Sequence, residues 1–476
     1  MTQNNFISYF WKFLERFSVQ VTSFITTLVL ARILSADEYG TVALVTVFIS
    51  LATVFVQGGL NTALIQKIEI DEEDISTIFW VSIIVALICY VIIFFMAFKI
   101  ANFYKKPIII PVIRILAISL FPGALNSIQI AISSRKLEFK KIFMSSLIAT
   151  VVAGIISIIL AIFNFGVWAI VAWQLINIFI SSILMLFFVK WKPRFLFSWV
   201  KFKNLIPFGS RILISNFLVT LFQNIRSLLI GGLYSTSDLA FFNRGKQFPQ
   251  VLMDGVIGSI QTVSLPIFAK HQREKLERYK ENMRKIITMS YLIIFPLLFG
   301  ITVISKPLIK LLLTDKWLEA VPYLQIFALT YTVQPMQIIC AEAIKGLGLS
   351  KVTLNLEYFR KFFEIGLLVC LLKYGPYKIA ISALIAGVIS FVISMYPNVK
   401  YLNYSIKEQI EDIIKPLIAS IIMSLIVLYI EKSNFSTMII LLFQIVAGIF
   451  IYILNCWILK IKDFNIVINI LKNKLI

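Results

Sequence analysis

Long apolar segments follow one another along almost the whole chain, and only short polar or Pro/Gly-containing connections separate them. A helix that crosses a membrane needs about 20 consecutive, mostly apolar residues. Fourteen segments meet that length, so the pattern predicts an all-α polytopic membrane protein with about 14 transmembrane helices. The predicted spans are 8–32, 41–65, 77–98, 108–132, 142–163, 167–189, 205–232, 239–268, 286–313, 321–344, 353–372, 377–397, 413–430 and 437–459.

The composition excludes the soluble classes of protein. Of the 476 residues, 59% are hydrophobic and only 14% are charged, whereas about a quarter of the residues of a soluble domain are charged. A water-soluble enzyme, a nucleic-acid-binding domain and a disordered chain are therefore ruled out. The residues up to Asn5 are polar and lead into an apolar helix without a small-residue cleavage site, so this helix is expected to be a transmembrane span.

The net charge of +21 is interpreted as a sign of membrane orientation. Lys and Arg gather in the cytoplasmic connections of membrane proteins. With fourteen spans, the termini and the connections on their side of the membrane hold 27 Lys and Arg, and the connections on the opposite side hold 10. The split predicts that both termini lie in the cytoplasm.

Metal and nucleotide sites are not expected in this chain. The four cysteines lie in apolar segments without CxxC spacing, and the single histidine, His271, lies in a basic connection. A zinc site cannot be assembled from such a set. The pattern GxxxxGK[ST] is also missing, so we expect no P-loop, no metal and no cofactor.

The chain repeats itself at an offset of 200 residues. The segment Ser-Ala-Asp-Glu-Tyr-Gly at 35–40 follows the first predicted span, and Ser-Thr-Ser-Asp-Leu-Ala at 235–240 follows the seventh. Each preceding helix carries four polar residues at helical spacing, and the two sets coincide at that offset. These residues are Arg16, Gln20, Ser23 and Thr27 in the first helix and Asn216, Thr220, Gln223 and Ser227 in the seventh.

The repeat predicts two six-helix lobes of the same orientation, because six is an even number of spans. We expect residues 1–204 to form the first lobe and residues 205–400 the second. Residues 401–476 are expected to hold two extra helices and a cytoplasmic tail. In transporters built from parallel repeats, the substrate site lies between the lobes.

Amide side chains inside the predicted spans are candidates for substrate binding. Polar groups are costly in hydrocarbon, so they face a cavity or another helix. For the Ser and Thr residues, hydrogen bonding between helices remains the simpler interpretation, whereas the amide-rich face of the eighth helix favours a wet cavity. The amide candidates are Gln20, Gln57, Asn126, Gln223 and Gln250.

Arginines inside predicted spans are candidates for an anion site. Arg226 has no acidic residue within a helical turn, and Arg114 is similar. Arg16 follows Glu15 directly, so an alternative for Arg16 is a side chain that reaches the cytoplasmic surface. Because the planar guanidinium can bind two oxygens at once, these three arginines favour a phosphate-bearing ligand.

One further charged group is expected to be structural. Glu357, Arg360 and Glu364 stand at i, i+3 and i+7 in one span. At that spacing the three side chains share a helix face and can neutralise one another.

Five short stretches together resemble the Wzx-type polysaccharide-unit flippases. The resemblance is closest to the branch of colanic-acid and teichuronic-acid exporters, within the superfamily of multidrug, oligosaccharidyl-lipid and polysaccharide transporters. One departure is Ala240-Phe241, where that family has Gly-Tyr. The matching stretches are LARILSADEYG at 30–40, ALIQK at 63–67, NFGVWAIV at 164–171, FNR at 242–244 and LLLTDKW at 311–317.

The resemblance implies a flippase and not an enzyme. Such a protein moves undecaprenyl-pyrophosphate-linked oligosaccharide units across the bacterial cytoplasmic membrane for O-antigen, capsule or exopolysaccharide synthesis. It implies alternating access of two lobes around a cationic cavity, driven by a cation gradient. Polysaccharide polymerase or ligase machinery of the same pathway is an implied partner.

Coupling to a gradient would need an acidic group in the cavity, and Asp254 is the candidate because it lies on the amide-rich face of the eighth helix. A permanent pair with Lys246 or Arg211 is the structural alternative.

Two other function classes stay open at this point. A cation-coupled multidrug-type antiporter of the same superfamily would need an acid-rich cavity, but arginines outnumber acids on the polar helices. An integral-membrane polysaccharide polymerase or ligase would carry a large outer loop with reactive residues, and the predicted outer connections are all short.

Overall fold

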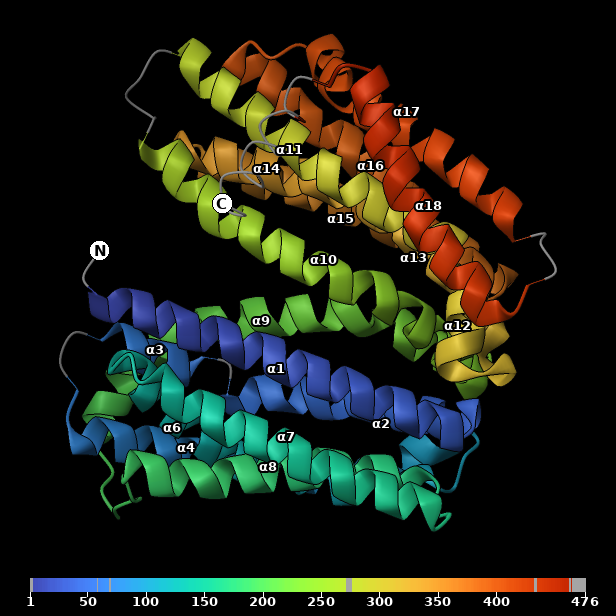
Figure 1. Ribbon diagram of the computed structural model, residues 1–476. Coiled ribbons are helices and arrows are strands. Elements are labelled where there is room, and N and C mark those ends of the chain that lie inside the picture. Colours follow the sequence, from blue (N-terminus) through green and yellow to red (C-terminus); the bar gives the residue numbers. More distant parts are fainter. Residues whose placement is uncertain are drawn as a thin grey trace. The chain divides into compact units, whose positions relative to one another are not determined.

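A computed structural model describes residues 3–57, 59–67, 70–270, 276–431, 435–461 and 464. His271 lies outside the described residues. The described chain is helical throughout apart from its short connections, and it divides into two compact units (Figure 1). The prediction of an all-α polytopic membrane protein is confirmed.

The first unit, Met1–Ala240, packs as a layered bundle of long helices. Within it, α7 packs along both α8 and α1, and α9 packs along α2 and α3. The unit contains α1 (Gln3–Ile33), α2 (Ala36–Gln57), α3 (Leu60–Gln66), α4 (Glu72–Phe103), α5 (Ile109–Ala117), α6 (Leu120–Arg135), α7 (Phe139–Ile162), α8 (Val167–Val189), α9 (Trp199–Leu233) and the start of α10 (Thr236–Lys270).

The second unit, Phe241–Ile476, contains the rest of α10 and the remaining helices. Here α11 packs along α17, and α15 packs along α16. The further elements are α11 (Leu276–Val303), α12 (Ser305–Leu313), η2 (Asp315–Ala320), α13 (Val321–Thr332), α14 (Gln334–Gly346), α15 (Ser350–Leu371), η3 (Leu372–Tyr374), α16 (Pro376–Leu402), α17 (Ile406–Ile430) and α18 (Thr437–Ile458).

Each of the fourteen predicted spans coincides with helical structure, and four of them are divided between two helices. The span 41–65 covers α2 and α3, 108–132 covers α5 and α6, 286–313 covers α11 and α12, and 321–344 covers α13 and α14. Among the described residues, 11 helical segments are long and apolar enough to cross a membrane. The more polar α10 and α15, and the short α13 and α14, fall outside that set. The total of fourteen spans therefore stays a prediction.

Local chemistry decides where several helices begin. Asp71 caps α4. Its carboxylate accepts from the backbone N–H of Asp74, and the Asp74 carboxylate accepts from the backbone N–H of Asp71. Between α7 and α8, Asn164 and Gly166 adopt left-handed backbone angles, which allow a turn of very few residues. A side chain at Gly166 would also collide with the carboxylate of Glu38.

Helix α17 is tied to α11 by charged and polar contacts. Arg284 of α11 donates two hydrogen bonds of 2.8 Å to the carboxylate of Asp412 in α17. Lys280 pairs with Glu408 at 2.6 Å, and the hydroxyl of Tyr404 donates to Asp412 at 2.5 Å. Helix α17 is thus locked to α11 at one end, so it is an integral part of this unit.

Candidate functional site

The candidate residues of α1 lie on its uncovered side. Helix α1 packs on α7 through Trp11, whose ring lies 5.5 Å from that of Phe143. Arg16 and Gln20 are both exposed and lie one helical turn apart. The carboxylate of Glu15 pairs with Lys12, so another cation engages the acid beside Arg16 in the sequence. The two side chains are therefore available to a ligand.

The hydroxyl stripe of α2 is used within the protein. Thr46, Ser50 and Thr53 each donate to a backbone carbonyl of their own helix at 2.7–2.8 Å. Thr46 also accepts a hydrogen bond of 3.1 Å from Gln174 of α8. For these residues the structural interpretation, hydrogen bonding inside the bundle, fits the observed contacts.

Two predicted amide residues, Gln57 in α2 and Asn126 in α6, lie in helices that pack on each other. Gln57 is half-buried, and its amide nitrogen lies 2.9 Å from the position that a Cβ on Gly123 of α6 would occupy. One turn further on, the amide of Asn61 donates to the hydroxyl of Ser127 at 2.7 Å. Asn126 is 8% exposed, and its Oδ1 atom has no hydrogen-bond partner among the described residues. This junction gathers amide groups from helices that are distant in the sequence.

Arg114 is held against α4. Its guanidinium carbon lies 3.9 Å from the ring centroid of Phe94, and its Nε donates to the Phe94 carbonyl at 3.3 Å. A cation over an aromatic face is attracted by the ring electrons. The side chain remains half-buried, so Arg114 is positioned by Phe94 whether or not it also meets a ligand.

The remaining candidates lie on α9 and α10. On α9, Gln223 is exposed and Arg226 is half-buried, and both belong to the first unit. On α10, Gln250 and Asp254 are both exposed and stand one turn apart, in the second unit. The structure therefore places three pairs of candidates as neighbours on single helices, whereas Gln57, Arg114 and Asn126 each stand alone on their helix.

The repeated turns after α1 and α9 share one capping geometry. Ser35 and Glu38 exchange hydrogen bonds of 2.7–3.3 Å, and Ser235 and Asp238 exchange the same set at 2.6–3.1 Å. Each serine hydroxyl accepts from the backbone N–H three residues on, and each acid accepts from the serine N–H. The sequence offset of 200 residues thus corresponds to the same local structure.

The two repeated turns also touch each other within the first unit. The Asp37 carboxylate accepts from the hydroxyl of Thr236 and pairs with Lys106. Gly40 lies so close that an added Cβ would stand 1.6 Å from the Thr236 carbonyl oxygen. The hydroxyl of Tyr104 completes the group by donating to a carbonyl of α9 at 3.5 Å. We call Asp37, Gly40, Lys106 and Thr236 the paired-turn contact.

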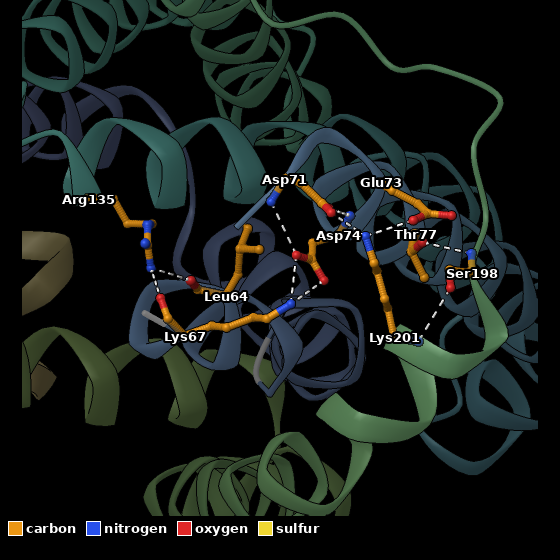
Figure 2. A network of polar contacts seen from close by, with 9 residues as sticks. All are labelled: Leu64, Lys67, Asp71, Glu73, Asp74, Thr77, Arg135, Ser198 and Lys201. Carbon is orange, nitrogen blue, oxygen red and sulfur yellow. Dashed lines mark hydrogen bonds and ion pairs between the residues drawn. The ribbon is translucent and has the colours of Figure 1, made fainter. Parts of the chain in front are cut away.

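A second polar network joins the start of α4 to the C-terminal ends of α3 and α6 and to the first turn of α9 (Figure 2). Lys67 pairs with Asp74 at 2.6 Å, and Arg135 donates to the carbonyl of Leu64 at 2.9 Å. Lys201 of α9 pairs with Asp71 and with Glu73, the latter at 2.7 Å. The hydrogen bond from the Lys201 ammonium holds the pKa of Asp71 at about 2.

Sequence reasoning missed both polar groups, although signals for them existed. Asp37 stands five residues after the first predicted span, in the repeated motif, and Thr236 stands at the neighbouring position of the second motif. Four consecutive acids at 71–74 are unusual in a connection that is predicted to be cytoplasmic, because such connections are usually rich in Lys and Arg. In both cases the residue that neutralises the charge is distant in the sequence.

Comparisons with known proteins agree with this architecture. Residues 29–322 match the family described as Polysaccharide biosynthesis protein. The Succinoglycan biosynthesis transport protein ExoT of Rhizobium meliloti is 24% identical over 71% of this chain and 68% of its own length. The Teichuronic acid biosynthesis protein TuaB of Bacillus subtilis is 27% identical over 58% of each chain.

The fold itself is that of a solved transporter. The Lipid II flippase MurJ, in an inward closed conformation, superposes with a TM-score of 0.73 over 94% of this chain and 98% of its own, at 16% identity. The family match covers more than half of the sequence, so this chain belongs to the family of polysaccharide biosynthesis proteins.

Proposed function

We propose that this protein translocates a lipid-linked oligosaccharide across the bacterial cytoplasmic membrane for the synthesis of a surface polysaccharide. The observation that carries the proposal is the family match over residues 29–322 in a bundle of membrane-spanning helices. ExoT is named as a transport protein, and MurJ is named as a flippase of lipid II. The substrate we favour is an oligosaccharide linked to undecaprenyl pyrophosphate.

The three candidate arginines are proposed to meet the pyrophosphate. Arg16 is exposed on α1. Arg226 lies on α9, the helix that repeats the polar pattern of α1. A guanidinium supplies two parallel donors to a phosphate group, which a lysine cannot do. Arg114 carries the same chemistry, but its stacking on Phe94 gives it less freedom to move.

The amide candidates are proposed to meet the sugars. Gln20, Gln223 and Gln250 are exposed, and an amide both donates and accepts hydrogen bonds, as sugar hydroxyls do. Gln57 and Asn126 contribute the same chemistry at the junction of α2 and α6. Asp254, one turn beyond Gln250, is proposed as the group whose charge changes during a gradient-driven cycle.

Deletion of the gene is the experiment that separates the function classes. A flippase predicts that a complete lipid-linked oligosaccharide accumulates on the cytoplasmic side, which mass spectrometry of extracted lipids would detect. A polymerase or ligase predicts single repeat units that have already reached the outer side. A multidrug antiporter predicts drug sensitivity with normal surface polysaccharide, and that result would end the proposal.

Arg226 provides the test at residue level. We expect Arg226→Ala to abolish export in the deletion strain while the protein still accumulates in the membrane. Arg226→Lys should keep part of the activity, since the charge stays and the two-oxygen fork is lost. Arg278→Ala, at an exposed position of α11, is the matched control and should export normally. Full export by Arg226→Ala would remove this residue from the site.

A further inference from the structure

The segment that links α8 to α9 is held firmly on the first unit. The indole N–H of Trp80 donates to the carbonyl of Arg194 at 2.8 Å, and the Trp80 ring stacks on Phe195 at 4.9 Å. The backbone N–H of Ser198 donates to the hydroxyl of Thr77 at 3.0 Å (Figure 2). With contacts in its middle and at its end, the segment has a defined surface.

Large apolar side chains of this segment and of the first turn of α9 are exposed. Phe195 is 92% exposed, Trp199 is 64% exposed and Val200 is 69% exposed. Phe197 is 49% exposed, and its ring lies 6.4 Å from the ring of Trp199. The rings of Phe197, Trp199 and Phe202 pack on one another and form one aromatic surface.

Exposed lysines flank these aromatic rings. Lys190, Lys192 and Lys203 are all exposed, and within the described part of the chain no carboxylate lies within ion-pair distance of them. The other two basic residues are engaged, since Arg194 pairs with Glu72 at 3.0 Å and Lys201 pairs with acids of α4. Three positive charges are therefore left for a partner outside the chain.

The position of the segment identifies the partner. It starts where α8 ends at Val189 and finishes where α9 begins at Trp199, and both helices meet the criteria for a membrane span. Residues at the ends of spanning helices lie at the level of the lipid headgroups, where Trp is enriched. Lysines beside a membrane surface attract anionic lipids.

We propose that residues 190–203 form a binding surface for anionic phospholipid headgroups, with the aromatic rings inserted between the acyl chains and the three lysines on the phosphates. This surface lies outside the proposed substrate residues and concerns lipids that stay in the bilayer. Because Ser198 also caps the first turn of α9, bound lipid would fix the start of that helix.

Photo-crosslinking in nanodiscs tests the proposal on the full chain. The probe is photoactivatable phosphatidylglycerol, with photoactivatable phosphatidylcholine as the zwitterionic comparison. Peptide mass spectrometry should place more phosphatidylglycerol than phosphatidylcholine on residues 190–203. Excess inorganic phosphate should not compete, because the rings require a lipid in the bilayer.

Charge-removing variants separate this surface from general lipid contact. The variant Lys190→Gln/Lys192→Gln/Lys203→Gln should lose the preference for phosphatidylglycerol, at about fivefold per lysine near the surface. The matched control, Lys105→Gln/Lys373→Gln/Lys378→Gln, removes three exposed lysines from other parts of the chain and should keep the preference.

The aromatic part has its own variant. The change Phe195→Ser/Trp199→Ser should lower crosslinking of both lipids on this segment. Equal labelling by the two lipids in the unaltered protein, or an unchanged preference in the triple glutamine variant, would overturn the proposal. Recovery of a protein crosslink in place of lipid on residues 190–203 in native membranes would overturn it as well.

Discussion

Gly40 is the position at which the smallest change should have the largest effect on the paired-turn contact. In Gly40→Ala, the new Cβ would stand 1.6 Å from the Thr236 carbonyl oxygen and 2.4 Å from its carbon. Real Cβ contacts are essentially never closer than 3.0 Å, so the two backbones must part by more than an ångström. Both neighbours are backbone atoms, so rotation of a side chain cannot relieve the clash.

The free-energy cost of Gly40→Ala can be compared with the cost of overpacking other protein interiors. Extra methyl groups in a packed site typically cost about 1–3 kcal/mol, which corresponds to about a 5- to 150-fold shift in a two-state equilibrium. The same substitution favours the helix itself by up to about 1 kcal/mol. The net prediction is that Gly40→Ala opens the contact between Asp37 and Thr236 without unfolding α2.

Disulfide formation measures that opening directly. A protein with Asp37→Cys and Thr236→Cys, and with alanine at its native cysteines, should crosslink readily in membranes, since the two side chains touch. Adding Gly40→Ala should slow the crosslinking markedly. Gly300→Ala is the matched control, because a Cβ there meets nothing within 4 Å. Crosslinking at the same rate in all three backgrounds would refute the close backbone approach.

Four further outcomes follow from the same contacts. Arg284→Ala should lower the free energy of unfolding by about 1–2 kcal/mol, as expected for a charged bidentate pair that is partly exposed, and a double-mutant cycle with Asp412→Asn should recover a coupling of that size. The lowered pKa of Asp71 means that its contribution to stability is present above its ordinary value of 3.8 and is lost as the pH falls towards about 2. The difference in melting temperature between the wild type and Asp71→Asn should therefore be constant from neutral pH to about pH 4 and shrink below it, and a constant difference down to pH 2 would contradict this. A reporter fused at residue 165 should be detected on the outer side of the membrane, and a cytoplasmic signal would break the fourteen-span topology. For Asp254→Asn, vesicles should lose gradient-driven transport while the lipid-linked substrate still binds, and transport at the wild-type rate would end its proposed coupling role.

Hydrophobic periodicity determined the helices of this protein because it reports a local property. Whether a segment of about 20 residues can leave water depends on its own side chains. All fourteen predicted spans coincide with helices for that reason, although 41–65, 108–132, 286–313 and 321–344 are each divided between two helices. The repeated turns were likewise visible in the sequence, since a capping box is complete within four residues.

The sequence alone did not predict which charged side chains form ion pairs. Arg360, grouped with two acids by helical spacing, pairs with Glu357 at 2.5 Å, whereas Glu364 pairs with Lys361 at 2.7 Å. Spacing places the three side chains on one face, but competing neighbours decide which of them meet. Arg360 is 7% exposed, and it also donates to the hydroxyl of Ser394 in α16. That partner comes close only because α15 packs along α16.

The contacts that join distant parts of the chain were decided by tertiary structure alone. Asp37 and Thr236 stand 199 residues apart, and Arg284 and Asp412 stand 128 apart. Hydropathy predicts that each helix enters the membrane, but it does not say which of its faces meets which neighbour. That choice depends on the packing of side chains and on the absence of side chains at glycines such as Gly40, where two backbones can meet only because no Cβ intervenes.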